Sequence, residues 1–458
     1  MMSRDERDID FEAVTNEAID FLNKEDMDGF RAIFLELHNY EQSEIYQTLS
    51  DQEKNTLYKF LSPEETADFF DHLELEPDEY EDLFDNIYAR YAAHIIGAMQ
   101  YDNAVDILNE ISREKMTTFL SLMNKDDASE IRSLMNYEED TAGGIMTTEI
   151  ISLNILMTVR EAMRHIKEMA PDSEMIYYLF VTDPENHLVG IISLRELIVA
   201  DDDDYIGDAM TERVVSVRVS DDQEEVAQIV RDYDFLAVPV VDYQDHLVGI
   251  VTADDIMDVI HEEAGEDYSR LAGMSDNEST SDSALETAKK RLPWLIGLTF
   301  MGMITAWMLS FFEDTLAKVV LLSAFIPVIS GMAGNTGTQS LAVAIRGIST
   351  GEIKESSKLK LAGRELGSGF LTGVVCGIVI FLIIIVMYQE PTLGIIVSGS
   401  LIASMSVATI IGTIVPLMMN KVGIDPAIAS GPFITTANDI ISLLIYFALA
   451  NVFMASLL

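Results

Sequence analysis

Five long apolar segments occupy the chain from Leu292 onward. They run over residues 292–312, 319–345, 367–388, 393–419 and 427–457. Each provides the roughly 20 residues that an α-helix needs to cross about 30 Å of hydrocarbon, where a helix satisfies its own backbone hydrogen bonds. The sequence therefore predicts an all-α membrane domain of five spans over residues 292–458.

One carboxylate, Asp439, lies inside the last of these segments. Counted from Ala427 at about 1.5 Å per residue, it lies roughly 18 Å into the segment, near the middle of the hydrocarbon. An aspartate there costs roughly 2.5–3.5 kcal/mol, so it usually faces a bundle interior or a watery path. We expect Pro432 to free backbone carbonyls beside it. An ion path is favoured, and a protonated aspartic acid bonded to a neighbouring helix is the alternative.

The second apolar segment contains Gly331, Gly334 and Gly337, which recur every third residue and predict close helix packing. Asn335 and Gln339, four residues apart, share a helix face. These two amides either line a pore or form hydrogen bonds between helices, and the sequence leaves both interpretations open.

The part of the chain before Leu292 is strongly acidic. The net charge is −48, and only seven of the 29 basic and eight of the 77 acidic residues lie from Leu292 onward, so the first 291 residues carry −47. Such a surface repels nucleic-acid phosphates and attracts cations. We expect a cation-responsive body that binds no nucleic acid. Charge that serves only solubility or a salt-rich habitat is the alternative.

Basic residues mark one side of the membrane. Only Lys318 lies on the other side. The first side carries nine: Lys289, Lys290, Arg291, Arg346, Lys354, Lys358, Lys360, Arg364 and Lys421. This asymmetry predicts a multi-pass cell-membrane protein with its N-terminal body in the cytosol and, after five spans, its C-terminus outside. The N-terminus has no apolar stretch, so no cleaved signal is expected.

Two soluble domains are expected before the membrane domain. Residues 1–139 show apolar positions recurring at three and four, as in Ala92–Met99 and Ala104–Ile111, which predicts a helical-repeat superhelix. An internal repeat follows, because residues 146–153 match 210–217 and residues 183–198 match 242–257. This repeat resembles a tandem pair of cystathionine-β-synthase (CBS) domains, α/β regulatory modules, over residues 140–265.

Within that repeat, Gly249 is expected to allow a strand to approach its neighbour closely, after a turn that closes a hairpin. The run from Gly249 through Thr252 to Asp255 resembles the adenosine-binding run of many CBS domains, which implies weak ATP or AMP binding with Asp255 on the ribose. The first repeat departs from this run at Glu196. An ordinary helix N-terminus at Thr252 and Asp255 is the alternative.

An acidic helix face and a linker follow the repeat. Asp255, Asp258, Glu262 and Glu266 are spaced by three and four residues, with Glu263 and Asp267 beside them. Like charges at this spacing repel, so bound Mg²⁺ or Ca²⁺ would stabilise the helix. A merely solvated face is the alternative. Residues 275–283 read as a polar linker, and Ser283 with Glu286 predicts a capping box that opens a short helix ending at Pro293.

The chain resembles the MgtE family of magnesium channels over nearly its whole length. The motifs are the helical N domain, Tyr137–Met146, the CBS pair, the Gly-Asn-Thr-Gly-Thr-Gln run at Gly334–Gln339 and Gly431–Asp439. The resemblance implies a homodimer in the lipid bilayer with a plug helix in the acidic linker region, residues 266–291. It implies metal ligands at Asp439, Asp222, Glu224, Asp234, Asp255, Asp258, Glu263, Glu266, Asp267 and Asp425, and pore-lining positions at Asn335, Gln339, Pro432, Thr435 and Asn438.

The function expected from residues and resemblance together is Mg²⁺-selective uptake through a channel or transporter. Regulatory Mg²⁺ on the acidic N, CBS and plug-helix regions is expected to close it, with possible ATP or AMP modulation. The alternative is a membrane-anchored metal or nucleotide sensor with no transport role. No nucleophile, base and oxyanion constellation appears in the sequence, so we expect no enzyme.

Overall fold

The computed structural model describes residues 4–73, 75, 77–274, 283–353 and 357–453. The chain folds into two compact units, Met1–Val259 and Ile260–Leu458. Most of the expected polar linker, residues 275–282, lies outside the described residues, as do the last five residues.

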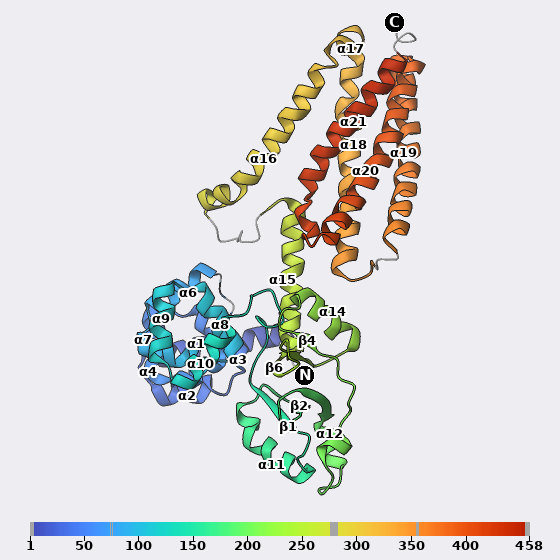
Figure 1. Ribbon diagram of the computed structural model, residues 1–458. Helices are drawn as coiled ribbons and strands as arrows, with labels where there is room; N and C mark the ends of the chain where they lie inside the picture. The colour runs from blue at the N-terminus through green and yellow to red at the C-terminus, as the bar shows by residue number, and fades with distance from the viewer. Residues whose placement is uncertain (1–3, 74, 76, 275–282, 354–356, 454–458) are drawn as a thin grey trace. The chain divides into compact units, whose positions relative to one another are not determined.

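The N domain is entirely helical in its described residues (Figure 1, blue to teal). Helices two positions apart along the chain pack together: α3 on α5, α5 on α7, α7 on α9, α6 on α8 and α8 on α10. This alternation is the packing of stacked helical repeats. The helices are α1 (Arg4–Asn23), α2 (Met27–Phe34), α3 (Asn39–Thr48), α4 (Asp51–Phe60), α5 (Pro63–Phe70), α6 (Pro77–Asp85), α7 (Ala89–Ile96), α8 (Tyr101–Glu110), α9 (Arg113–Leu122) and α10 (Lys125–Leu134).

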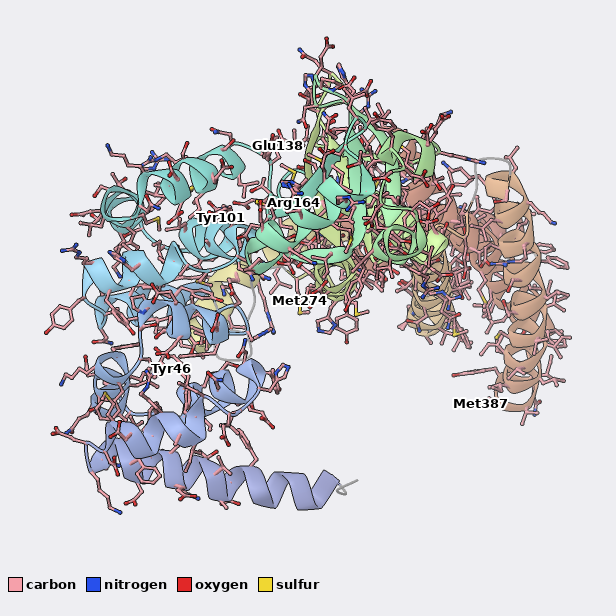
Figure 2. The ribbon with its side chains drawn as sticks, turned by 90° about the horizontal axis from the view of Figure 1, so that it is seen from below. Tyr46, Tyr101, Glu138, Arg164, Met274 and Met387 are labelled. Carbon is pink, nitrogen blue, oxygen red and sulfur yellow. The ribbon has the colours of Figure 1, made fainter. Side chains whose placement is uncertain are left out.

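Aromatic side chains fill the centre of this domain. Phe30 and Phe34 are fully buried and stacked at 4.8 Å between ring centroids, and Phe69 meets Phe34 edge-on at 5.6 Å. Tyr46, labelled in Figure 2, is 1% exposed and packs against Phe69 and Phe70. Burial of such rings supplies much of the stability of a small helical stack.

Two small three-stranded sheets follow, each with one parallel and one antiparallel pair, in the orders β1-β2-β3 and β4-β5-β6. The two sheets repeat one topology, as the internal sequence repeat predicts. The elements are β1 (Ile150–Asn154), α11 (Val159–Met169), β2 (Met175–Thr182), β3 (Leu188–Ser193), α12 (Leu194–Val199), α13 (Ile206–Ala209), β4 (Val217–Arg218), α14 (Gln223–Tyr233), β5 (Ala237–Val241), β6 (Leu247–Thr252) and α15 (Ala253–Ala272).

The two repeats exchange matching contacts. A Cβ on Gly249 would lie 2.8 Å from Sδ of Met146, and a Cβ on Gly190 would lie 2.3 Å from Sδ of Met210. The close approach expected at Gly249 is thus confirmed, and its partner is the methionine that opens the other half of the repeat. Each repeat therefore needs the other to bury its own surface.

The membrane domain contains five helices long and apolar enough to cross a bilayer among the described residues. They are drawn yellow to red in Figure 1. The elements of this domain are α16 (Ala284–Ser310), α17 (Glu313–Lys318), η2 (Val320–Phe325), α18 (Ile326–Ser349), α19 (Lys358–Tyr388), α20 (Pro391–Lys421), η4 (Pro426–Ile428) and α21 (Gly431–Val452).

The prediction of a short helix that ends at Pro293, before the first span, is wrong. Ser283 and Glu286 do form the capping box, but the helix runs through Pro293 and ends at Ser310. A proline removes one backbone hydrogen bond, and neighbouring groups in membrane helices compensate for that loss. Residues 284–291 are therefore the first turns of α16 rather than a separate helix.

Small residues let the membrane helices approach closely. On α19, Gly369, Gly373 and Gly377 face α20, where a Cβ at Gly369 would lie 2.6 Å from Thr409 Oγ1. On α18, a Cβ at Gly334 would lie 2.7 Å from Thr435 Cγ2, whereas Gly331 has open space around it in the single chain. The predicted close approach is therefore confirmed at Gly334 and at Gly337, where a Cβ would lie 2.0 Å from Asn438 Nδ2, whereas no neighbour reaches Gly331 within the single chain.

Candidate ion path and regulatory metal sites

Asp439 lies on a polar seam where α18 and α21 pack antiparallel. Ser330 of α18 donates a hydrogen bond to its carboxylate. About one turn nearer the start of α21, Thr435 Oγ1 lies 3.2 Å from Thr338 Oγ1 of α18. No other charged side chain is present in α21. The Asp439 side chain is half-buried, and its hydrogen-bond partner is the hydroxyl of Ser330.

The expectation that Pro432 frees carbonyls beside Asp439 is wrong. Pro432 lies in the first turn of α21, where its missing N–H would have no helical partner in any case. The carbonyl of Pro432 accepts a hydrogen bond from Thr436 Oγ1 at 2.8 Å. Because the helix begins at Gly431, Asp439 lies roughly 12 Å from its start, inside unbroken helix.

The amides expected to line a pore occupy different surroundings. Asn335 and Gln339 are exposed on α18, in the single chain. Asn438 is 2% exposed, and neither of its side-chain polar atoms has a partner among the described residues. It packs on Gly337, where a Cβ would lie 2.0 Å from Asn438 Nδ2. Asn438 thus lies within the helix packing rather than on a free face.

A charged cluster joins the end of α15 to the loop before α21. Arg270 lies between two carboxylates, bonding Glu266 at 2.7 Å and also Asp425. Asp267, beside it, accepts a hydrogen bond from Ser349 Oγ at 2.5 Å. Burial raises the pKa of the Asp267 carboxyl, with the nearby Asp425 adding to the effect and Ser349 opposing it. We call these residues the α15 clamp: Glu266, Asp267, Arg270, Ser349 and Asp425.

Sequence reasoning placed Glu266, Asp267 and Asp425 as metal ligands but missed Arg270. The i, i+4 spacing of Glu266 and Arg270 is a signal that was available. The contact of Arg270 with Asp425, 155 residues away along the chain, was not readable from any local pattern.

A second acidic cluster lies within the first unit, between α8 and the CBS pair. It comprises Asp102 just after Tyr101 (labelled in Figure 2), Glu174, and Asp254 and Asp255 at the start of α15. Burial and the neighbouring Asp255 raise the pKa of Asp102 well above its ordinary value. Burial, Asp255 and Asp254 likewise raise the pKa of Glu174.

Carboxylates that resist ionisation together form a site that a divalent cation would stabilise. Sequence reasoning named Asp255 but missed Asp102 and Glu174, because their proximity depends on how α8 packs on the CBS pair.

The contacts of Asp255 favour the interpretation that Thr252 and Asp255 form an ordinary helix N-terminus rather than an adenosine site. Its carboxylate accepts hydrogen bonds from Thr252, from Oγ1 and from the backbone N–H at 3.3 Å. Burial raises the pKa of Asp255, and the Thr252 hydroxyl lowers it. A ribose on Asp255 would have to replace the hydroxyl of Thr252, whose residue is only 4% exposed.

Three other expected ligands lie at the ends of α14. Asp222 caps its N-terminus by accepting from the Glu224 backbone N–H at 2.9 Å, and Asp234 ends it in the left-handed conformation, with φ 54°. An 11-residue helix separates Asp222 from Asp234 by roughly 16 Å, so the two cannot share an ion within one chain. Of the remaining expected ligands, Asp258 is exposed and Glu263 half-buried on α15.

Comparison with known proteins covers almost the whole chain. The protein named "Magnesium transporter MgtE" of Enterococcus faecalis is 48% identical over 436 residues, covering 95% of this chain and 96% of its own length. The chain belongs to the MgtE family of magnesium transporters. MgtE proteins of Bacillus subtilis and Thermus thermophilus are 38% and 33% identical over 93% and 94% of this chain, covering 94% and 96% of their own lengths.

The MgtE domain models follow the observed architecture. "Divalent cation transporter" matches residues 326–449, "MgtE intracellular N domain" matches 37–140, and "CBS domain" matches 142–203 and 206–262.

Two solved structures resemble the part of the chain before the membrane helices. "Crystal structure of the soluble part of a magnesium transporter" has a TM-score of 0.54 at 50% identity and covers 56% of this chain and 99% of its own. "Crystal structure of the cytosolic domain of the Mg2+ channel MgtE in complex with ATP" has a TM-score of 0.50 at 33% identity, covering 54% and 99%.

Proposed function

We propose that this MgtE-family chain is a Mg²⁺-selective channel for magnesium uptake, with its ion path along the α18–α21 seam. The observation that carries this proposal is Asp439, the single charge of α21, held half-buried against a row of hydroxyls. A charge at that depth is costly unless it serves an ion path or a strong partner.

The seam suits hydrated Mg²⁺. This ion gives up its waters reluctantly and is usually held through one or two carboxylates with several waters retained. Asp439 supplies the carboxylate, and Ser330, Thr338 and Thr435 can hydrogen-bond to the waters of a passing ion. The geometry therefore favours a hydrated ion over one stripped by a cage of protein oxygens.

A homodimer would complete this path. Asn335 and Gln339 are exposed in the single chain, although they lie on the same helix as Ser330. Exposed amides in a spanning helix are costly against lipid, so a second α18 facing them is the better environment. Two chains around one axis would bring two Asp439 carboxylates to one path.

Mg²⁺ uptake into liposomes by the purified chain tests this proposal. Asp439→Asn keeps the shape and removes the charge, and contacts to a charged group contribute about 1.5–3 kcal/mol, so uptake should fall roughly 10- to 100-fold. Glu390→Gln, an exposed carboxylate between α19 and α20, is the matched control and should transport normally. Normal uptake by a well-inserted Asp439→Asn protein would refute the path.

A sensor without transport is the runner-up, and it predicts no uptake by the unmodified chain. The α18–α21 seam favours transport, because a sensor has no need of a carboxylate inside a spanning helix.

Cytosolic Mg²⁺ is proposed to close the channel through the acidic clusters. The α15 clamp and the Asp102–Glu174–Asp255 cluster each gather carboxylates whose repulsion a divalent ion would relieve. Residues 266–291 would then contain the plug, with the end of α15 as the moving part. Closure requires that ions bind the compact state more tightly than the open one.

Nucleotide binding at Thr252 and Asp255 is the weaker part of the proposal. Its support is that a 33% identical cytosolic domain is described in complex with ATP. Calorimetry with the whole chain should show ATP binding that Asp255→Ala removes. No heat with the unmodified chain would leave Asp255 as a cap and metal ligand.

A further inference from the structure

A basic pocket lies where α18 ends and α19 begins. It is a cavity of about 360 Å³ surrounded by the side chains of Arg346, Lys360 and Arg364, with one carboxylate, Glu352. We call these four residues and their cavity the basic pocket. Three cations around one cavity stand out in a chain of net charge −48. None of the functions described above uses it.

The described residues that follow α18, up to Ile353, fold back on the end of that helix. The backbone N–H of Ile353 donates to the carbonyl of Gly347 at 2.9 Å, and Gly351 supplies the turn with φ +67°. A Cβ on Gly347 would lie 2.6 Å from Ile353 Cδ1, so the Ile353 side chain packs directly over this glycine. The apolar side chain of Ile353 thereby forms part of the pocket wall.

The cations of the pocket differ in how they are held. Arg364 donates to Glu365 at 3.1 Å, and Glu365 in turn accepts from Ser340 Oγ at 2.9 Å, which fixes the guanidinium. Within the described part of the chain, Arg346 and Lys360 form no ion pair. All three cations are exposed, and Arg364 is in addition hydrogen-bonded to Glu365, a combination that suits a phosphate group.

The walls of the pocket continue into apolar surface that is exposed in the single chain. Val343 of α18 is 42% exposed beside the cations. On α19, residues 7 and 11 positions after Arg364 share its face, and these are Leu371 and Val375, exposed by 66% and 63%. Ile378 continues the row at 56%. A phosphate in the pocket would therefore have an apolar track leading from it along a spanning helix.

We propose that the basic pocket binds an anionic phospholipid, with the headgroup phosphate on Arg346, Lys360 and Arg364 and an acyl chain along α19. The leaflet is the one next to the end of α15, because Ser349, at the end of α18, bonds Asp267 of α15. A soluble phosphate would use the cations alone and leave the apolar track without a role. The positive-inside preference explains basic loops, but it does not gather three cations around one walled cavity.

The test measures lipid binding to the purified full-length chain in detergent. Binding is detected by a shift in the melting temperature of the protein and by native mass spectrometry. Dioleoyl phosphatidylglycerol should raise the melting temperature and appear as a bound adduct. Dioleoyl phosphatidylcholine and inorganic phosphate should do neither. Each Lys or Arg near an anionic lipid surface contributes about a fivefold gain in affinity, so Arg346→Gln with Lys360→Gln should weaken phosphatidylglycerol binding about 25-fold.

Matched variants distinguish lipid binding in the basic pocket from a general effect of positive charge. Lys358→Gln with Lys421→Gln removes the same two charges outside the basic pocket, since Lys358 Nζ instead contacts Asn420 at 3.4 Å. This pair should bind phosphatidylglycerol as the parent does. Arg346→Lys with Lys360→Arg should restore most of the binding, because it retains the charges.

Three results would overturn the proposal. They are equal loss of binding in both charge-removing pairs, a melting shift reproduced by inorganic phosphate, and a change in oligomeric mass instead of a lipid adduct. The assay involves no Mg²⁺ flux, so its outcome is independent of the proposed transport function.

Discussion

Asp71, at the end of α5, illustrates what single buried acids do in this protein. Burial raises the pKa of its carboxyl from 3.8 to about 7, although Asn103 Nδ2 donates to it at 3.2 Å. Because the folded chain holds this proton more tightly than the unfolded one, the Asp71 carboxyl destabilises the fold as pH rises from about 4 to about 7.

Asp71→Asn should therefore flatten the pH dependence of stability. Without divalent ions, the melting temperature of the parent should fall more steeply than that of the variant between about pH 5 and pH 7, since only the parent must ionise a buried acid. The measurement is thermal melting of the purified chain with a chelator at several pH values. Parallel curves for the two proteins would contradict the assignment.

Gly337 is the residue on which the packing of α18 depends. A Cβ there would lie 2.0 Å from Asn438 Nδ2, so Gly337→Ala should destabilise the membrane domain by about 1–3 kcal/mol and reduce uptake. Gly367→Ala, on α19, meets open space in the single chain and is the control. Melting temperature and liposome uptake measure both effects. Equal behaviour of the two variants would show that the contact is unimportant.

Among the elements, α15 links the soluble and membrane parts of the sequence. It starts at Ala253, after the last CBS strand, and ends at Ala272, where Leu271 packs with Ile345, Ala427 and Ile434. In the α15 clamp, Arg270 bridges Glu266 and Asp425. The guanidinium of Arg270 thus holds the end of α15, and bound divalent ions would hold it more firmly.

Arg270→Gln should release the end of α15. It leaves Glu266, Asp267 and Asp425 close together without their cation, and half-exposed ion pairs contribute up to about 1 kcal/mol each. The cytosolic Mg²⁺ concentration at which the channel is half closed should therefore change by roughly two- to fivefold. Arg270→Lys keeps the charge and should behave closer to the parent, and Arg231→Gln, on exposed α14 surface, is the control. Mg²⁺ uptake measured against internal Mg²⁺ gives the result, and an unchanged midpoint would exclude the clamp from gating.

The net charge of the whole molecule comes almost entirely from the part of the sequence before Leu292. The first 291 residues hold −47, and their mutual repulsion is screened by monovalent salt only beyond about 8 Å. Divalent ions that bridge nearby carboxylates would remove the repulsion where it is strongest. The proposed gate is therefore a balance between a repelling acidic body and the ions that hold it together.

Neutralising Glu263, Glu266 and Asp267 together should leave Mg²⁺ flux persisting at internal Mg²⁺ concentrations that stop the parent. In the parent, chelation should speed amide hydrogen exchange in the second half of α15, because the divalent ions that hold this part of the helix are removed. The triple variant should show no such response. A triple variant that shuts at the parent's concentration would place the sensor elsewhere, with the Asp102–Glu174–Asp255 cluster as the remaining candidate.

The sequence alone determined the elements whose signals are local. Apolar length gave five spans, the 146–153 and 210–217 repeat gave two equivalent sheets, and Ser283 with Glu286 gave a helix start, because each depends on neighbours a few residues away. The family followed from motifs spread along nearly the whole chain. Asp439 also stood out locally, as one charge in an apolar run.

Tertiary structure alone decided which of these residues meet. The contact of Arg270 with Asp425, the gathering of Asp102 with Asp255, and the burial of Asn438 against Gly337 all join segments far apart in the chain. Pro432 does not break a helix because it lies in the first turn of α21, where its missing N–H has no helical partner in any case. Local patterns set which helices form, whereas charge clusters arise only where packing brings distant carboxylates out of water together.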